Sequence, residues 1–415
     1  MSTASARPVA YLLTLFPKLS ETFVLNEVVN LQRAGLPIVP VSLARSSDLE
    51  TTTHAAVGLL RTAPVYAADG FPLAHIGATL DWLLRRPAKL FRLVLANQRH
   101  PAPRGESRGG RLALALVVGA LLEREGIRRV HAHWSYPADI AHLLAPLLGL
   151  SVSLSAHAHD IYEDIDLYEE AGLLYATRVA RVDFVATCTA TNAAYVKERL
   201  PAELRGRVVH VYHGLDLNAF AVPSDQIRAP HVISVGRQVW CKGFDVVIQA
   251  AALVRDRGLE FTCSLVGPPG PETPRLASRI RELRLEPSVQ LVGPLTQEEL
   301  RSLLQRSTVL VNASWPHGEW GVANVIVEAM ASGVPVIASD RPQVREYLVH
   351  GENGLLTRAG DVEELADAIE LLLTEPLLRT RLAAKGRSSV ERLFDIERAT
   401  STLVGLFGAG RRAAA

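Results

Sequence analysis

Two cations bracket a short loop that directly follows an apolar run. Arg237 comes after the run from His231 to Gly236, and Lys242 stands five residues later, just before an expected helix. Fixed positive charges between the end of a strand and the start of a helix suit a diphosphate. The alternative is an exposed pair without a ligand. The chain has only five lysines, which favours a functional Lys242.

A second cluster runs from Glu319 to Pro335 and contains a glycine loop followed by an apolar helix pattern. We expect the helix to begin near Val322, with the free backbone N–H groups of its first turn aimed into the cleft, where they can bind an anion. Glu328 stands among apolar neighbours, where a carboxylate needs a partner. That partner is either a ribose hydroxyl or a structural hydrogen bond inside the protein.

Histidines recur at alternate positions on two expected strand ends, in His131-Ala-His133 and His157-Ala-His159. Residues i and i+2 of a strand share a face, and this spacing also occurs in zinc hydrolases. Structural histidines and a ligand contact by His157 are the alternatives. We expect no metal site, because the rest of the chain offers no further ligand cluster of recognised spacing.

The elements that must position these residues alternate between strand and helix. In the second half, we expect the strands 231–236, 261–267, 289–293, 308–314 and 335–340, with helices over 244–257 and 322–332. Thr296 with Glu299, and Asp361 with Glu364, have the spacing of helix capping boxes. Such alternation is typical of a parallel sheet covered on both faces, which is a Rossmann-like arrangement.

The first half repeats the alternation less regularly, with a helix over 20–34 and the expected strands 9–15, 38–43, 129–133, 152–157, 184–188 and 208–212. We therefore predict an α/β protein with two Rossmann-like domains, 1–222 and 223–395, that face a shared cleft. A C-terminal helix, 396–415, is expected to pack back on the first domain. Ligands of open α/β sheets bind at the carboxyl ends of the strands.

The stretch 71–129 departs from this pattern, because it is helical and rich in arginine. Between residues 81 and 129 there are eleven Lys/Arg against four Asp/Glu, interleaved with apolar residues such as Trp82 and Phe91. The stretch is either a solvated helix face or a basic amphipathic surface that docks on an anionic membrane.

Composition excludes several classes of protein. The 415 residues carry 44 Lys+Arg against 43 Asp+Glu, and this balance argues against capture of nucleic acid over the whole surface. Three cysteines are too few for a disulfide framework, and no apolar run reaches the length of a membrane span. We expect a cytoplasmic protein. Signatures of P-loop ATPases, dinucleotide-binding dehydrogenases and serine hydrolases are absent from the sequence.

Eight motifs in this order give the chain a resemblance to a known family. The second half contains VGR…KGFD (235–245), LVGPLTQEEL (291–300), VIVEAMASGVPVIASD (325–340) and GENGLL (351–356). The first half contains LFPKLSETFVLNEV (15–28), HAHW (131–134), SAHAHDIY (155–162) and VYHGLDLNAF (211–220). The sequence resembles the retaining GT-B glycosyltransferases of family 4, in their exopolysaccharide and colanic-acid branch.

The resemblance implies transfer of a sugar from a nucleoside diphosphate sugar to a hydroxyl of a saccharide or lipid-linked acceptor, with no metal and no cofactor. It assigns donor binding to the loop Gly321–Val325 and to a set of single residues: Gly236, Arg237, Lys242, Gly267, Gly293, Gly321, Val322, Ala323, Asn324, Val325 and Glu328. Among these, Arg237 and Lys242 bind the diphosphate and absorb its charge, and Glu328 binds the ribose. His157 contacts the donor sugar or its phosphate, while Ser20, Glu21 and Thr22 shape the acceptor side.

One position departs from the family pattern. The family places a first glutamate where this chain has Trp320, and the acidic residue here is Glu319, one position earlier. Either the loop shifts so that Glu319 still reaches the sugar, or Trp320 stacks there and the choice of donor is unusual. A nucleotide-sugar epimerase and a catalytically silent nucleotide-sugar-binding partner are the alternatives to a transferase. Peripheral contact with the inner face of an anionic membrane would suit a lipid-linked acceptor.

Overall fold

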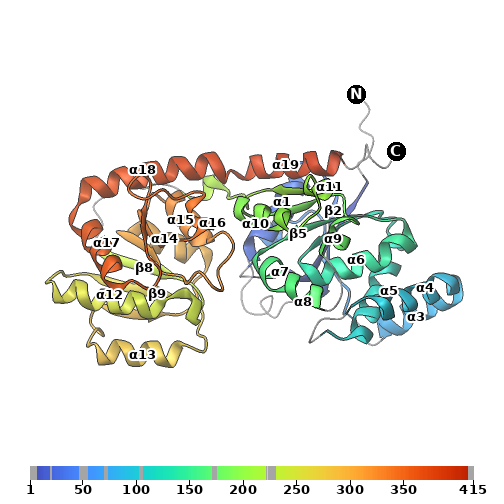
Figure 1. Ribbon diagram of the computed structural model, residues 1–415, viewed down its shortest axis with the longest axis horizontal. Helices are drawn as coiled ribbons and strands as arrows, with labels where there is room; N and C mark the ends of the chain where they lie inside the picture. The colour runs from blue at the N-terminus through green and yellow to red at the C-terminus, as the bar shows by residue number, and fades with distance from the viewer. Residues whose placement is uncertain are drawn as a thin grey trace. The chain divides into compact units, whose positions relative to one another are not determined.

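The computed structural model describes residues 7–18, 21–45, 55–69, 73–101, 106–170, 175–220, 222 and 230–409. The chain forms two compact units (Figure 1). One comprises Met1–Gly214 together with Ile396–Ala415, and the other comprises Leu215–Asp395.

The first unit has a parallel seven-stranded sheet in the order β3-β2-β1-β4-β5-β6-β7. Its strands are β1 (Val9–Leu15), β2 (Ile38–Ala44), β3 (Val65–Tyr66), β4 (Arg129–His133), β5 (Ser151–Ala156), β6 (Val185–Thr187) and β7 (Val208–His210). Strand β1 buries apolar side chains on both faces, whereas β4 and β5 bury apolar side chains on one face and polar ones on the other, namely His131, His133, Ser153 and Ser155. The order reverses between β1 and β4, where β1 pairs with β2 on one side and β4 on the other.

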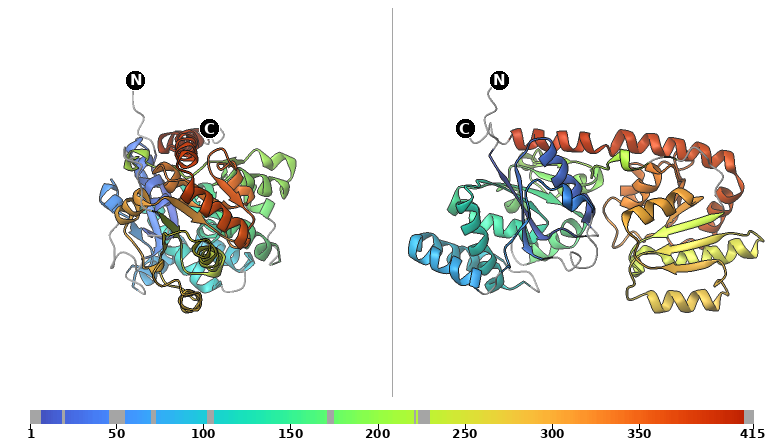
Figure 2. Two further views of the ribbon diagram at one scale, coloured as in Figure 1. Left: turned by 90° about the vertical axis from the view of Figure 1, so that its left-hand side faces the viewer. Right: turned by 180° about the vertical axis from the view of Figure 1, so that it is seen from behind.

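Helices cover both faces of this sheet (Figures 1 and 2). They are α1 (Thr22–Arg33), the 3₁₀ helix η2 (Ala55–Leu59), α3 (Leu73–Arg85), α4 (Pro87–Arg99), α5 (Arg108–Arg124), α6 (Ser135–Leu148), α7 (Ala158–Tyr162), α8 (Asp164–Glu170), α9 (Tyr175–Val179), α10 (Ala190–Glu198), α11 (Ala202–Arg205) and α19 (Ile396–Ala409). Helix α19 packs on α1 through the buried Leu403 and Phe407, so the end of the chain completes the core of this unit.

The second unit has a parallel six-stranded sheet in the order β10-β9-β8-β11-β12-β13. The strands are β8 (His231–Val235), β9 (Thr262–Val266), β10 (Val289–Val292), β11 (Val309–Asn312), β12 (Val336–Ser339) and β13 (Leu355–Thr357). The helices are η3 (Leu217–Ala219), η4 (Trp240–Lys242), α12 (Phe244–Asp256), α13 (Thr273–Glu282), α14 (Gln297–Arg306), α15 (Asn324–Ala331), α16 (Pro342–Arg345), α17 (Val362–Thr374) and α18 (Pro376–Leu393). The strand order reverses between β8 and β11, so both units have the doubly wound parallel architecture predicted from the sequence.

Local signals fixed several helix starts as expected. Thr296 and Glu299 form the complete capping box, in which the Thr296 hydroxyl accepts from Glu299 N and the Glu299 carboxylate accepts from Thr296 N. Asp361 caps α17 by accepting from Glu364 N, but the Glu364 carboxylate accepts from Arg358 N instead of closing the second box. Helix α15 begins at Asn324, two residues later than expected, because Ala323 keeps an extended backbone.

The arginine-rich stretch forms the helices α3, α4 and α5, which gather in one part of the first unit (Figure 1). Trp82 is fully buried there, and its indole N–H donates to Leu116 O at 3.1 Å. Several other apolar side chains of α3 and α4 remain exposed, among them Leu73, Leu84 and Phe91 at 77%, 78% and 65%. Among the described residues, no helix has both the length and the apolar character of a membrane span.

Candidate functional site

The two motif loops of the second unit lie at the carboxyl ends of adjacent strands. Arg237 and Lys242 follow β8, and the segment from Ala313 to Ala323 follows β11, the neighbour of β8 across the point where the strand order reverses. Ligands of doubly wound sheets bind at this position, because the connections to either side leave the sheet in opposite directions. The strand order therefore brings together the loops after β8 and β11, whose residues Lys242 and Glu319 are 77 positions apart in the sequence.

Glycines allow the backbones around these loops to approach closely. Gly243 has φ +64°, and a Cβ there would lie 2.1 Å from Ala313 O, so no other residue fits between the two loops. Gly267 has φ +145°, and a Cβ there would lie 2.0 Å from the carbonyl oxygen of Gly236. Gly293 follows β10 at the edge of the sheet, where a Cβ would meet nothing within 4 Å.

Lys242, Glu319 and Arg341 form a polar network between the loops. Lys242 Nζ pairs with Glu319 Oε1, and both side chains are less than a fifth exposed. Arg341, which is 1% exposed, donates from Nη1 to Glu319 O at 2.6 Å and from Nη2 to Asn312 Oδ1 at 3.3 Å. Arg341 therefore fixes the backbone of the loop at Glu319, and Glu319 in turn orients the ammonium group of Lys242.

Arg237 is exposed, and its charge acts on the same loop. Burial raises the pKa of the Cys241 thiol, and the nearby Glu319 carboxylate raises it further, while Lys242 and Arg237 oppose that shift. All three charges therefore lie near Cys241. This loop can hold an anion with one positive charge open to solvent and a second one preoriented by a carboxylate.

Helix α15 presents a half-buried face with Asn324, Val325 and Glu328, while Ile326, Val327, Ala329 and Met330 on its other side are buried. Burial raises the pKa of Glu328 to about 7, and the charge of Arg301 only partly opposes this shift. Within the described part of the chain, no side chain donates a hydrogen bond to the Glu328 carboxylate. The expected backbone donors Gly321 and Val322 belong to the loop that precedes α15, since the helix starts at Asn324.

In the first unit, histidines gather at the carboxyl ends of β4 and β5. His133 Nδ1 lies 3.0 Å from His157 Nε2, and His133 Nε2 lies 3.5 Å from Glu27 Oε1 on α1. The Tyr11 hydroxyl donates to the same Glu27 oxygen at 2.9 Å. Imidazoles and a carboxylate thus form a chain that leads inward from His157.

The histidine pairs have different roles from those that the i, i+2 spacing suggests. His131 is fully buried, and its two ring nitrogens lie within 2.9 Å of the hydroxyls of Ser153 and Ser155. Burial, together with the charge of His133, lowers the pKa of His131 to about 3, so it is a neutral core residue. His159 does not follow on a strand: it lies on α7, is exposed and pairs with Glu163 at 3.0 Å.

The backbone around His157 is held in a defined position. His157 N donates to Asp160 Oδ1 at 2.6 Å, and this bond fixes the turn from β5 into α7. Burial lowers the pKa of His157 well below its ordinary value, and the charges of His133 and His213 add to the effect. Trp134, whose ring centroid lies 4.8 Å from that of His157, has φ +67°, a region that favours glycine. Such strain is found at functional sites.

The expected acceptor-side residues lie at the start of α1. Glu21 is the N-cap of this helix and pairs with Lys18 at 2.5 Å, and Thr22 is the first helical residue. Ser20 lies outside the described residues. Both Glu21 and Thr22 are half-buried, so their side chains are partly accessible to a ligand.

Sequence reasoning missed four residues: Glu27, His213 and Arg341 of these clusters, and Cys188, which lines one small pocket with His157 and His213. Glu27 and His213 stand inside motifs that the sequence offered, whereas Arg341 follows the last residue of one such motif. Cys188 carried no signal beyond its position at the end of an expected strand. All three cysteines are buried and none forms a disulfide, in keeping with a cysteine count too low for a disulfide framework.

Comparison with known proteins agrees with this geometry. The family described as "Glycosyl transferases group 1" matches residues 229–375. The alpha-D-kanosaminyltransferase of Streptomyces kanamyceticus is 28% identical over 306 residues, which cover 69% of this chain and 78% of that protein. The lipopolysaccharide core biosynthesis glycosyltransferase LpsE of Rhizobium meliloti is 35% identical over 201 residues, or 48% of this chain and 54% of that one.

Solved structures share the fold over nearly the whole chain. Anabaena HepE in complex with UDP and glucose superposes with a TM-score of 0.73 at 17% identity, covering 97% of this chain and 100% of that chain. Sucrose-phosphate synthase from Thermosynechococcus elongatus gives a TM-score of 0.74 at 20% identity, covering 98% and 100%. Residues 229–375 are therefore a glycosyl transferases group 1 domain, and the chain that carries them is a glycosyltransferase with the GT-B fold.

Proposed function

We propose that the protein transfers a sugar from a nucleoside diphosphate sugar to a hydroxyl of a saccharide or lipid-linked acceptor in the synthesis of a cell-surface polysaccharide. The observation that carries this proposal is the pair Arg237 and Lys242 on the loop after β8, beside the loop that leads into α15. Two cations at a strand end can bind a diphosphate and stabilise the charge that develops as it leaves. Relatives named for lipopolysaccharide core and amylovoran biosynthesis support the polysaccharide context.

In this proposal, the anomeric configuration is retained and no metal takes part in the transfer. The leaving phosphate helps to deprotonate the acceptor hydroxyl, while Arg237 and Lys242 absorb its charge. Glu328 accepts hydrogen bonds from the ribose, and the loop before α15 supplies backbone N–H groups. His157 contacts the donor sugar or its phosphate, and the acceptor binds on the side of Glu21 and Thr22.

Glu319 keeps a place in this mechanism despite its shifted position in the sequence. Its carboxylate pairs with Lys242, and its backbone carbonyl is held by Arg341. We propose that Glu319 exchanges Lys242 for the donor sugar hydroxyls when the diphosphate takes over the ammonium group. In this proposal Glu319, and not Trp320, makes the contact with the sugar that a carboxylate at position 320 makes in the family.

The exposed apolar residues of α3 and α4 support a second part of the proposal, which is peripheral docking on an anionic membrane. Leu73, Leu84 and Phe91 are more than 60% exposed, and the exposed Arg85 and Arg92 follow Leu84 and Phe91 in the sequence. Apolar side chains rimmed by arginine suit insertion among anionic headgroups. Such docking would bring a lipid-linked acceptor to the enzyme.

A nucleotide-binding screen tests the donor site directly. We expect one of UDP, GDP and ADP, or one of their sugars, to raise the melting temperature of the purified chain in the presence of EDTA. Lys242→Ala should abolish that shift. Arg257→Ala is the matched control, because Arg257 is a cation of the same unit that pairs with Glu363, Asp367 and Glu370 on the surface.

Acceptor-dependent release of the nucleotide separates the transferase from its alternatives. An epimerase would convert the sugar without an acceptor, and a silent binding partner would be stabilised by nucleotide without turnover. A screen in which no nucleotide stabilises the protein would overturn the proposal.

A further inference from the structure

Three soft donor side chains converge at the ends of three neighbouring strands of the first unit. His157 follows β5, Cys188 follows β6 and His213 comes shortly after β7, and these strands are adjacent in the sheet. One ring nitrogen of each histidine and the sulfur of Cys188 lie within 4.8 Å of one another. His157 is 9% exposed and Cys188 is 3% exposed.

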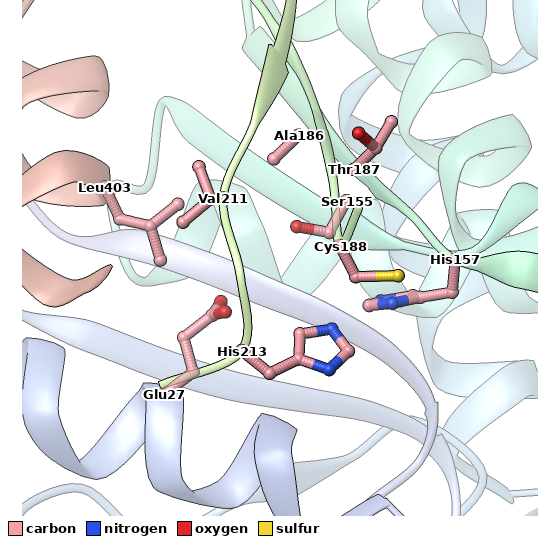
Figure 3. A pocket seen from close by; sticks show the side chains of 9 residues that line it. All are labelled: Glu27, Ser155, His157, Ala186, Thr187, Cys188, Val211, His213 and Leu403. Carbon is pink, nitrogen blue, oxygen red and sulfur yellow. The ribbon is translucent and has the colours of Figure 1, made fainter. Parts of the chain in front are cut away.

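The three side chains line one small pocket, which Figure 3 shows together with Glu27 and the surrounding backbone. Its cavity of about 10 Å³ corresponds to the space that one water molecule needs. His157 Nδ1 and both ring nitrogens of His213 are buried without a hydrogen-bond partner. Unpaired buried nitrogens are costly, so this group points to a ligand that takes one lone pair from each histidine.

We propose that His157, Cys188 and His213 bind one divalent transition-metal ion of the zinc type. Imidazole nitrogen and thiolate sulfur are the donors that such ions prefer, at about 2.0–2.1 Å and 2.3 Å. A tetrahedral ion places these donors about 3.5 Å apart, so the side chains must close by about 1 Å on binding. The Cys188 thiol releases its proton to solvent as the metal–sulfur bond forms.

The surroundings already have the form of an outer ligand sphere. His157 Nε2 is engaged with His133 Nδ1, and His133 continues to Glu27, which gives the imidazole–carboxylate chain common behind metal-bound histidines. The Phe23 ring stacks on His213 at 4.0 Å and fixes its plane. Asn192 Nδ2 donates to the Cys188 sulfur at 3.8 Å, a contact that favours the thiolate.

The charges around the pocket agree with a cation at this place. A divalent ion with one thiolate retains a single positive charge. Glu27 also lines the pocket, and its carboxylate can balance that charge.

Metal bound at this site would inhibit sugar transfer. This consequence rests on the function proposed above. A metal on His157 Nδ1 leaves this histidine without a free nitrogen for the donor sugar, because Nε2 is engaged with His133. Zinc and donor are then mutually exclusive at His157. The metal-binding proposal itself does not depend on transfer.

Titration of the metal-stripped, reduced full-length chain with Co²⁺ tests the proposal without an activity assay. We expect one Co²⁺ per chain, with the charge-transfer absorption of a cobalt–thiolate bond and the intense visible bands of a tetrahedral site. Zn²⁺ should displace it stoichiometrically. Cys188→Ser should abolish the charge-transfer band, and His213→Gln should weaken binding by at least about tenfold.

Cys263→Ala is the matched control, because Cys263 is a buried cysteine of the other unit. It should keep both the band and the affinity. Far-UV circular dichroism checks that each variant folds. If Cys188→Ser does not fold, His213→Gln provides the test. Absence of a thiolate band in the unmodified chain, or unchanged binding in both variants, would overturn the proposal. Failure of the nucleotide screen would not affect this result, since that site lies in the other unit.

Discussion

The carboxylate of Glu328 offers the sharpest test of the donor site, because its protonation and its proposed ligand compete. Burial raises its pKa from the ordinary 4.5 to about 7. Ribose hydroxyls that donate to Glu328 need the ionised form, so binding of a nucleotide should release a proton. With a pKa of about 7, roughly one-tenth of Glu328 is ionised at pH 6 and roughly nine-tenths at pH 8.

The expected effect is therefore an increase in nucleotide affinity of about tenfold between pH 6 and pH 8, or about 1.4 kcal/mol. Isothermal titration of the stabilising nucleotide at pH 6, 7 and 8 measures the change, and buffers of different ionisation enthalpy count the protons released. In Glu328→Gln this part of the pH dependence should vanish. The difference between the two proteins is the relevant quantity, because ionisation of the nucleotide contributes equally to both.

The raised pKa of Glu328 also makes the folding stability depend on pH. The folded state holds the Glu328 proton more tightly than the unfolded state, so its contribution is complete below pH 4.5 and is lost as the pH rises through about 7. The loss is at most about 3 kcal/mol, and less in practice since the side chain is only partly buried. Equal pH slopes of nucleotide affinity in the parent and in Glu328→Gln would refute the assignment of Glu328 to the ribose.

Three further perturbations test the remaining parts of the structure. Glu319→Gln should lower sugar transfer by about tenfold or more without weakening nucleotide binding, since Lys242 keeps its charge; unaltered turnover would remove Glu319 from the site. Gly243→Ala should destabilise the protein by about 1–3 kcal/mol in denaturant melts, because it forces a strained φ and a clash with a carbonyl oxygen of the neighbouring loop; wild-type stability would contradict that geometry. Leu84→Ser should reduce sedimentation with anionic vesicles, whereas Leu377→Ser, an equally exposed leucine of the other unit, should not; if the parent protein sediments equally with neutral vesicles, the docking surface is wrong.

The sequence by itself determined the alternation of strands and helices and the starts of α12, α14 and α17. Thr296 with Glu299 predicted its capping box because that interaction spans a single turn and depends on no distant residue. Strand positions followed in the same way, since residues buried on both faces of a parallel sheet form short continuous apolar runs. The start of α15 was misplaced by two residues, because Ala323 keeps an extended backbone that no local sequence signal marks.

Only the tertiary structure decided which side chains meet. Lys242 pairs with Glu319, 77 residues away, because β8 and β11 are neighbours in the sheet. His133 meets His157 instead of acting with His131, and Cys188 joins His157 and His213, because β4, β5, β6 and β7 lie side by side. Periodicity records local hydrogen bonding and burial, whereas the partners at the strand ends depend on strand order, which no local pattern in the sequence encodes.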